Sequence, residues 1–188
     1  MNNNLKTGER MASKSTSLKS VSGNISTGYN WLFVHKDKDG NVKDQMVIEN
    51  RIVDEGLDYA LDSSLGGGTQ IIEWYIGLTD ANPNVAPEDT MSSHAGWSEV
   101  TQYEDTTRPV WNSNSVSNQS ISNTVNPAVF VFDADGVTVG GAFLVSDNTK
   151  GGTTGTLYAA GAFEKGDKSF DIGDTIEVTA IFTNSYGE

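Results

Sequence analysis

The stretch from Gln70 to Thr79 (QIIEWYIGLT) most constrains the fold of this chain, because it is the longest run dense in β-branched and aromatic residues. Three glycines precede it and a polar loop follows it. Ten extended residues span about 33 Å, roughly the width of a small domain. Alternate residues of the stretch share one wholly apolar face: Ile72, Trp74, Ile76 and Leu78. We therefore expect a central strand whose apolar face points into the core.

Shorter segments of the same character recur along the chain, with turn-forming residues between them. The first two flank Asp39-Gly40, a dipeptide typical of hairpin turns. Short strands that recur every 8–12 residues or so are typical of a β-sandwich or barrel. The sequence predicts a mainly β fold, an antiparallel β-sandwich that resembles a jelly roll. The segments are 29–35, 42–49, 127–132, 137–145, 156–163 and 174–184.

Residues 50–65 carry the one clear helical pattern, because apolar side chains recur there every four residues. The resulting stripe consists of Val53, Leu57, Leu61 and Leu65. Asn50 is suited to cap the N-terminus of a helix, and the glycines after Leu65 are suited to end it. We expect this helix and the strand that follows it to form one packed unit.

The domain organisation follows from where core-forming side chains occur. Residues 1–28 have few of them and predict an extended N-terminal arm, while residues 29–188 predict a single β-sandwich domain. A chain of 188 residues is long enough to bury a core without metals or disulfides. It has no cysteine, so thiol chemistry is excluded. Both Met1 and Met11 remain candidate natural starts.

The charge is strongly acidic and unevenly distributed. The formal net charge is −13, but residues 1–20 carry +3 and the remainder therefore −16. An acidic body disfavours nucleic acid and anionic membranes as partners, and no apolar run is long enough to span a membrane. A solvated tail is the commoner outcome for such an arm; the alternative is an arm that binds a partner of its own. Its cations are Lys6, Arg10, Lys14 and Lys19.

The sequence contains no catalytic motif, so we expect no enzyme activity and no cofactor. Asp37–Asn41 and Asp133–Gly136 resemble calcium loops, but glycine falls fourth instead of sixth and no helices flank them. Both predict hairpin turns instead. Single imidazoles are weak metal signals, and we expect His35 and His94 to be hydrogen-bonded or surface side chains.

The tryptophans Trp31, Trp74, Trp97 and Trp111 are compatible with two roles. They could form a sugar-stacking platform, or they could anchor the core and a subunit interface, since tryptophan buries a large area wherever it lies. We expect the core or interface role, because tryptophan serves it more often than it forms a sugar platform. Candidate contacts with a partner are the four arm cations together with Trp97, Arg108 and Trp111.

The region from about residue 45 to 183 resembles virion proteins of tailed bacteriophages. The motifs that carry the resemblance lie at residues 50–62, 74–78, 89–91, 94–100, 108–111, 140–144 and 173–179. The resemblance implies a structural protein of the virion head surface, made in the host cytoplasm. It implies a capsid cement or decoration protein that bridges subunits of the major capsid protein as a homo-oligomer, with a trimer as our hypothesis. The alternative is a tail- or fibre-associated protein, with glycan binding as a further role.

Overall fold

The computed structural model describes residues 25–186. The described chain is mainly β and all its named strand pairings are antiparallel, which confirms the predicted fold class. No helix among these residues has the length and apolar character needed to cross a membrane. The elements are β1 (Ile25–Lys36), β2 (Val42–Ile52), α1 (Asp54–Leu61), the π-helical turn η1 (Asp62–Gly66), β3 (Tyr75–Thr79), β4 (Ser120–Ser122), β5 (Ala128–Val131), β6 (Val137–Val139), β7 (Gly141–Val145), β8 (Leu157–Ala162), β9 (Lys168–Phe170) and β10 (Thr175–Tyr186).

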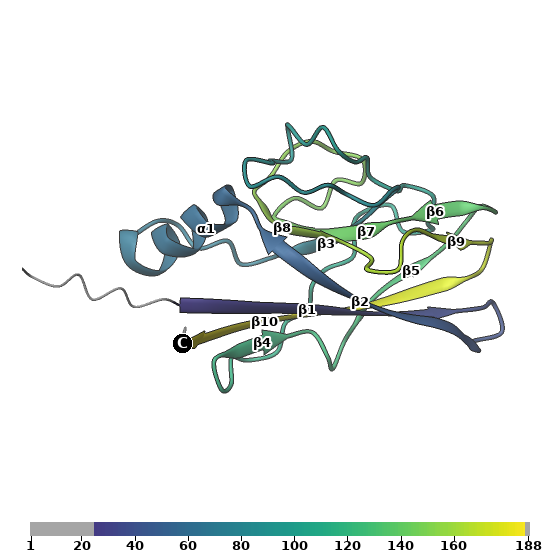
Figure 1. Ribbon diagram of the computed structural model, residues 1–188, viewed down its shortest axis with the longest axis horizontal. Helices are drawn as coiled ribbons and strands as arrows, with labels where there is room; N and C mark the ends of the chain where they lie inside the picture. The colour runs from purple at the N-terminus through teal and green to yellow at the C-terminus, as the bar shows by residue number, and fades with distance from the viewer. Residues whose placement is uncertain (1–24, 187–188) are drawn as a thin grey trace, which may run out of the picture.

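Two sheets face each other and share one strand, β2 (Figure 1). The first sheet runs β2-β1-β10, with β4 and β5 both paired to β10. The second runs β2-β8-β7-β3. β2 pairs with β1 over its first part and with β8 over Asn50–Ile52, so it passes from one sheet to the other. A short ribbon of β6 and β9 accompanies them.

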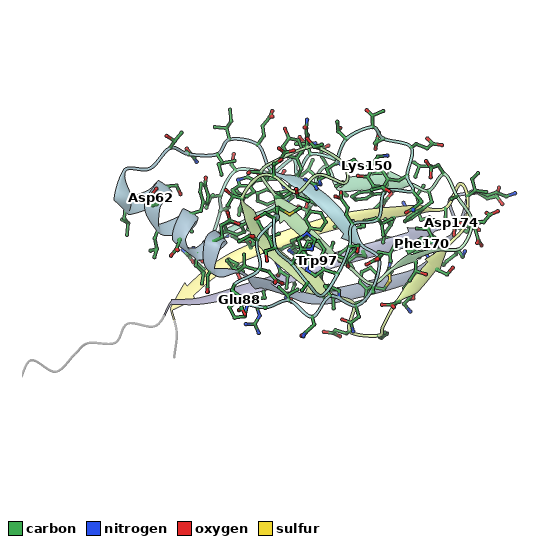
Figure 2. The ribbon with its side chains drawn as sticks, turned by 90° about the horizontal axis from the view of Figure 1, so that it is seen from above. Asp62, Glu88, Trp97, Lys150, Phe170 and Asp174 are labelled. Atoms are coloured by element: carbon green, nitrogen blue, oxygen red, sulfur yellow. The ribbon has the colours of Figure 1, made fainter. Side chains whose placement is uncertain are left out.

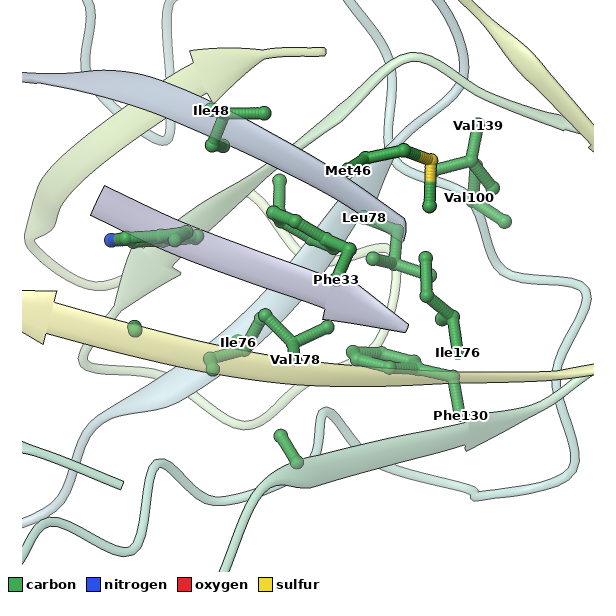
Figure 3. Packing of buried hydrophobic residues seen from close by; sticks show 14 of the residues in the cluster. Phe33, Met46, Ile48, Ile76, Leu78, Val100, Phe130, Val139, Ile176 and Val178 are labelled. Atoms are coloured by element: carbon green, nitrogen blue, oxygen red, sulfur yellow. The ribbon is translucent and has the colours of Figure 1, made fainter. Parts of the chain in front are cut away.

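The main core lies between the two sheets (Figure 3). Alternation places Trp31 and Phe33 of β1 inward, both fully buried, while Leu32 between them is exposed. Figure 3 shows side chains from both sheets pointing into this shared core. Among them are Phe33, Ile48, Ile76, Leu78, Phe130, Ile176 and Val178.

The second sheet is also covered on its outer side. A smaller cluster that contains Tyr75, Met91, Trp97 and Phe143 lies there, because the loop from residue 80 to 110 covers that face. Every residue of β3 and β7 is therefore buried. A strand buried on both faces has a continuous apolar sequence, and this explains why the run around β3 is so dense.

The predicted strand 70–79 is wrong in length and in place. Only Tyr75–Thr79 is a strand, and β3 lies at the end of the sheet order instead of the centre. Ile76 and Leu78 are fully buried as predicted, but Ile72 is 88% exposed. The cause is a contact with the helix: the Tyr59 hydroxyl donates to the carbonyl of Ile71 and accepts its amide, and this ties the segment to α1.

The predicted helix 50–65 is also corrected. Asn50 is a buried strand residue and not the cap; Val53 occupies the N-cap position of α1. The face of α1 that meets the sheet contains Gly56, where an added Cβ would lie 2.2 Å from the carbonyl oxygen of Tyr158. The helix therefore lies on β8 through its small residues and leaves its leucines outside. The predicted glycine ending is confirmed by Gly67, with φ of 80°.

Other boundaries follow the sequence more closely. The hairpin of β1 and β2 is confirmed, with Asp37 Oδ1 accepting the amides of Asp39 and Asn41 in its turn. β1 begins at Ile25, so residues 25–28 of the predicted arm belong to this strand. The arm cations Lys6, Arg10, Lys14 and Lys19 lie outside the described residues.

Candidate functional site: apolar surfaces of the sandwich

An aromatic pocket of about 260 Å³ opens at the end of the sandwich that carries α1. α1, the segment before β3, β8 and β10 each contribute to its wall, so it lies where the two sheets separate. Its aromatic lining residues are Tyr59, Trp74, Trp111, Tyr158 and Phe182, and we call the hollow that they line the aromatic pocket. A second hollow of about 250 Å³ shares Ile121, Tyr158 and Phe182 with it. The two hollows thus adjoin and form one groove.

The rings of the aromatic pocket pack edge to face. Tyr59 meets Trp74 at 5.2 Å between centroids, and Trp74 meets Tyr158 at 5.3 Å, with interplanar angles of 70° and 68°. Tyr158 and Trp111 both meet Phe182, at 84° and 82°. Edge-to-face packing holds each ring against its neighbour and stabilises the wall beyond simple burial. The wall is therefore preformed, and it presents ring edges more than an open flat platform.

A row of exposed leucines lies on the outside of α1 and of the π-helical turn η1 that continues it. Leu57, Leu61 and Leu65 are 45%, 61% and 84% exposed, and we call these three the leucine ridge. Asp54, Asp58 and Asp62 have the same spacing and are also exposed. Residues 54–66 contain no lysine or arginine. One side of this helical segment is thus apolar and acidic at once.

The outer face of the first sheet is apolar as well. Leu32 of β1 lies directly opposite Val47 of β2. On the other side of β1, Glu177 of β10 lies between Val34 of β1 and Val129 of β5. Leu32, Val47 and Val129 are exposed. We call this set with Val34 and Ile181 the sheet face. Glu177, which lies between Val34 and Val129, forms an ion pair with Lys36, so the face also contains one charged pair. Strands that are solvated on one face normally carry polar residues there, so an apolar outer face needs explanation.

The structure places two of the predicted partner-contacting residues in the interior. Trp97 is buried in the outer cluster of the second sheet and stacks on His94, with ring centroids 3.8 Å apart. Arg108 is only 1% exposed. Its guanidinium donates two hydrogen bonds to Glu99 and one each to the carbonyls of Asp147 and Gly152. It therefore ties the loop of residues 80–110 to the loop between β7 and β8, and its charge is paired inside the protein.

Trp111 differs from these two because it lines the aromatic pocket while its indole Nε1 donates to the carbonyl of Ala180 at 3.4 Å. The structure thus keeps Trp111 near a candidate site but separates it from Trp97 and Arg108. The core role predicted for the four tryptophans is favoured, because Trp31, Trp97 and Trp111 are buried and Trp74 is half-buried against the core. Tyr59, Tyr158 and the leucine ridge are the surface features that sequence reasoning missed.

The opposite end of the molecule holds a buried polar network (Figure 2). Asp174 and Phe170 lie at that end, while Asp62 lies at the helical end. Asp174 Oδ2 accepts from Lys43 at 2.9 Å and from the Asp171 amide, and it pairs with His35 Nε2 at 2.8 Å. Burial acts to raise the pKa of Asp174, but the hydrogen bonds from Lys43 and His35 outweigh it and hold the pKa below its ordinary value.

This network and the predicted turns are structural. His35 packs its ring on Phe170, and His94 bonds the carbonyl of Trp97, so both imidazoles are hydrogen-bonded as predicted. The hairpin predicted at Asp133–Gly136 is wrong, because this turn connects β5 to β6, which pair with β10 and β9 and not with each other. Asp135 in the turn accepts the amide of Ile172. Within residues 25–186 no group of three or more His, Asp or Glu side chains is placed to bind a metal ion.

Comparison with known proteins finds no family model, no curated protein and no solved structure that matches this chain.

Proposed function

We propose that this chain is a structural component of a tailed-phage virion, and specifically a capsid cement or decoration protein that bridges subunits of the major capsid protein. The sheet face is the observation that carries the proposal. Leu32, Val47 and Val129 stay in water although the chain has formed its core without them. Contiguous apolar surface of this kind marks protein contact sites.

The chemistry of the body supports an assembly role over catalysis. The buried charged groups among the described residues are Asp89, Arg108 and Asp174, and each is hydrogen-bonded inside the body. The sheet face belongs to paired strands that hold its side chains in place, and related faces of identical copies can meet around a symmetry axis. A homo-oligomer, with a trimer as the specific hypothesis, is part of the proposal.

The location is tested by mass spectrometry of separated phage heads and tails with copy-number measurement. We expect hundreds of copies in heads. Recovery in tails alone would overturn the cement assignment and favour the tail- or fibre-associated alternative.

The surface is tested by Val47→Glu, which places a charge in the middle of the sheet face. We expect a loss of oligomer in light scattering and a loss of incorporation into heads. Thr138→Glu, on the exposed side of β6, is the matched control and should change neither. A wild-type protein that is a monomer at all concentrations would remove the oligomer from the proposal.

Glycan binding for host attachment is a second candidate function, and the aromatic pocket favours it. Trp74 and Tyr59 are half-buried rings at an open hollow, as a sugar-binding site requires. The informative variant is Trp74→Ala, because Trp97 and Trp111 are buried and their loss would disturb the fold. Glycan-array binding by the wild type that disappears in Trp74→Ala would support this function, and an array without binding would exclude it for the glycans displayed.

A further inference from the structure

The leucine ridge is a second exposed apolar surface, separate from the sheet face. Its three leucines follow one another at the spacing that places side chains along one side of a helix. The free energy of leaving them in water is unfavourable, and the described residues leave 45%, 61% and 84% of Leu57, Leu61 and Leu65 exposed. A covering segment would need apolar side chains for the leucines.

The charges beside the ridge specify what else that segment needs. Asp54 and Asp58 are exposed, and no ion pair between described residues involves either of them. Because the helical segment has no cation of its own, a covering segment with Lys and Arg would gain from both the Coulomb attraction and the leucine contact. The ridge is therefore complementary to a basic chain that carries a few apolar residues.

The N-terminal arm, residues 1–24, has this composition. It carries Lys6, Arg10, Lys14 and Lys19 against Glu9 as its single acid. Leu5, Met11, Leu18 and Val21 lie between the cations. No other stretch of comparable length in this acidic chain has a net positive charge of this size.

The topology brings the start of the described chain to the correct end of the molecule. β1 and β2 are antiparallel, with Asn30 opposite Glu49. β1 read backwards from Asn30 to Ile25 and β2 read forwards from Glu49 to α1 therefore leave the hairpin at the same end (Figure 1). The ridge runs over the nine residues 57–65, about 12 Å along the helical segment. Twenty-four residues can reach about 80 Å when extended, so length does not limit the contact.

We propose that, in the free protein, the basic N-terminal arm docks on the leucine ridge of its own copy. The covalent tether makes the local concentration of the arm millimolar, so a contact of modest intrinsic affinity is populated without a second molecule. The proposal is independent of the virion assignment, since it concerns the free protein.

The test is zero-length carbodiimide cross-linking of the full chain, which joins lysines to carboxylates that are in contact. Equal amounts of ¹⁴N- and ¹⁵N-labelled protein are mixed before the reaction and the linked peptides are identified by mass spectrometry. We expect links from Lys14 or Lys19 to Asp54, Asp58 or Asp62, with both peptides carrying the same isotope. Links that pair the two isotopes would assign the arm to a neighbouring copy and overturn the proposal.

Charge reversal supplies the second arm of the test. Asp54→Lys with Asp58→Lys should lower the yield of these links at least tenfold, and so should Lys14→Glu with Lys19→Glu. The combined variant, in which the charges are exchanged, should restore linking with the donor and acceptor sides reversed. Glu164→Lys with Asp167→Lys, two exposed acids in another turn, is the matched control and should leave the yield unchanged.

Two further results decide the outcome. Raising the salt concentration from 20 to 500 mM should lower the yield in the wild type, because screening weakens exposed charge pairs. An arm that links evenly to acids across the body, or a yield that survives charge reversal, would overturn the proposal. Circular dichroism shows whether Asp54→Lys with Asp58→Lys still folds. If it does not, the yield of Lys14→Glu with Lys19→Glu decides the test, because these two substitutions lie outside the described body.

Discussion

The two ends of the sandwich differ in how far their charged and apolar side chains are buried and bonded within the protein. At the turn end, Asp174 is buried, and its carboxylate is bonded by His35 of β1, by Lys43 of β2 and by the nearby amide of Asp171. At the helical end, leucines face water and Asp54 and Asp58 have no ion-pair partner among the described residues. Groups that stabilise the fold are thus concentrated at one end and groups available to a ligand at the other. Substitutions of the same chemical kind should therefore give very different results at the two ends.

The largest expected effect is at the turn end. Asp174→Ala leaves His35 and Lys43 without their shared acceptor, and we expect a loss of about 2–3 kcal/mol in the free energy of unfolding. The measurement is urea denaturation followed by tryptophan fluorescence. Asp58→Ala at the helical end is the matched control and should change the stability by less than about 0.5 kcal/mol. Equal effects of the two substitutions would refute the contrast between the ends.

Gly56→Ala tests the one place where the helical end is tightly packed. Alanine normally stabilises a helix interior by about 1 kcal/mol relative to glycine. Here its Cβ would lie 2.2 Å from a backbone carbonyl oxygen that no rotamer change can move. We expect the clash to dominate and the protein to lose about 1–3 kcal/mol, measured by the same denaturation. A gain in stability would show that α1 does not lie on β8 through this residue.

Lowering the pH protonates Asp174 at the turn end. We expect a smaller loss of stability than from Asp174→Ala, because a protonated carboxyl group still makes hydrogen bonds. The folded-state pKa of Asp174 lies below its unfolded value, so its stabilisation is present above the unfolded pKa and is lost as the pH falls through the folded pKa. We expect the unfolding free energy of the wild type to fall below about pH 4. Asp174→Asn should show a flatter profile in that window, and identical profiles would contradict this role.

Much of the fold was predictable because it depends on local patterns. Alternation in β1 and Asp39-Gly40 specify the first hairpin, whatever the rest of the chain does. The error at residues 70–74 has a nonlocal cause, since these residues have strand-forming side chains but are held by Tyr59. The residue types of the segment give no indication of such a hydrogen bond.

The helix shows why the candidate surfaces were harder to predict. A leucine stripe normally marks the buried side of a helix, and here it marks the exposed side. The contrary signal was present in the sequence, because Gly56, Ala60 and Ser63 form a small-residue side at helical spacing. Small residues permit close approach of backbones, as at Tyr158. For Arg108 no such signal exists, since its burial depends on Glu99 and on carbonyls more than thirty residues away.

The smallest expected effect on stability is at the leucine ridge. Leu61→Ser with Leu65→Ser removes side chains that are 61% and 84% exposed. We expect the free energy of unfolding to change by less than about 0.5 kcal/mol for each, whereas Ile76→Ala in the core should cost about 2–5 kcal/mol. The same double substitution should lower the binding of a hydrophobic dye at high salt, where the arm is released. A large loss of stability would mean that the ridge is part of the folded core and would remove the distinction between the two ends of the molecule.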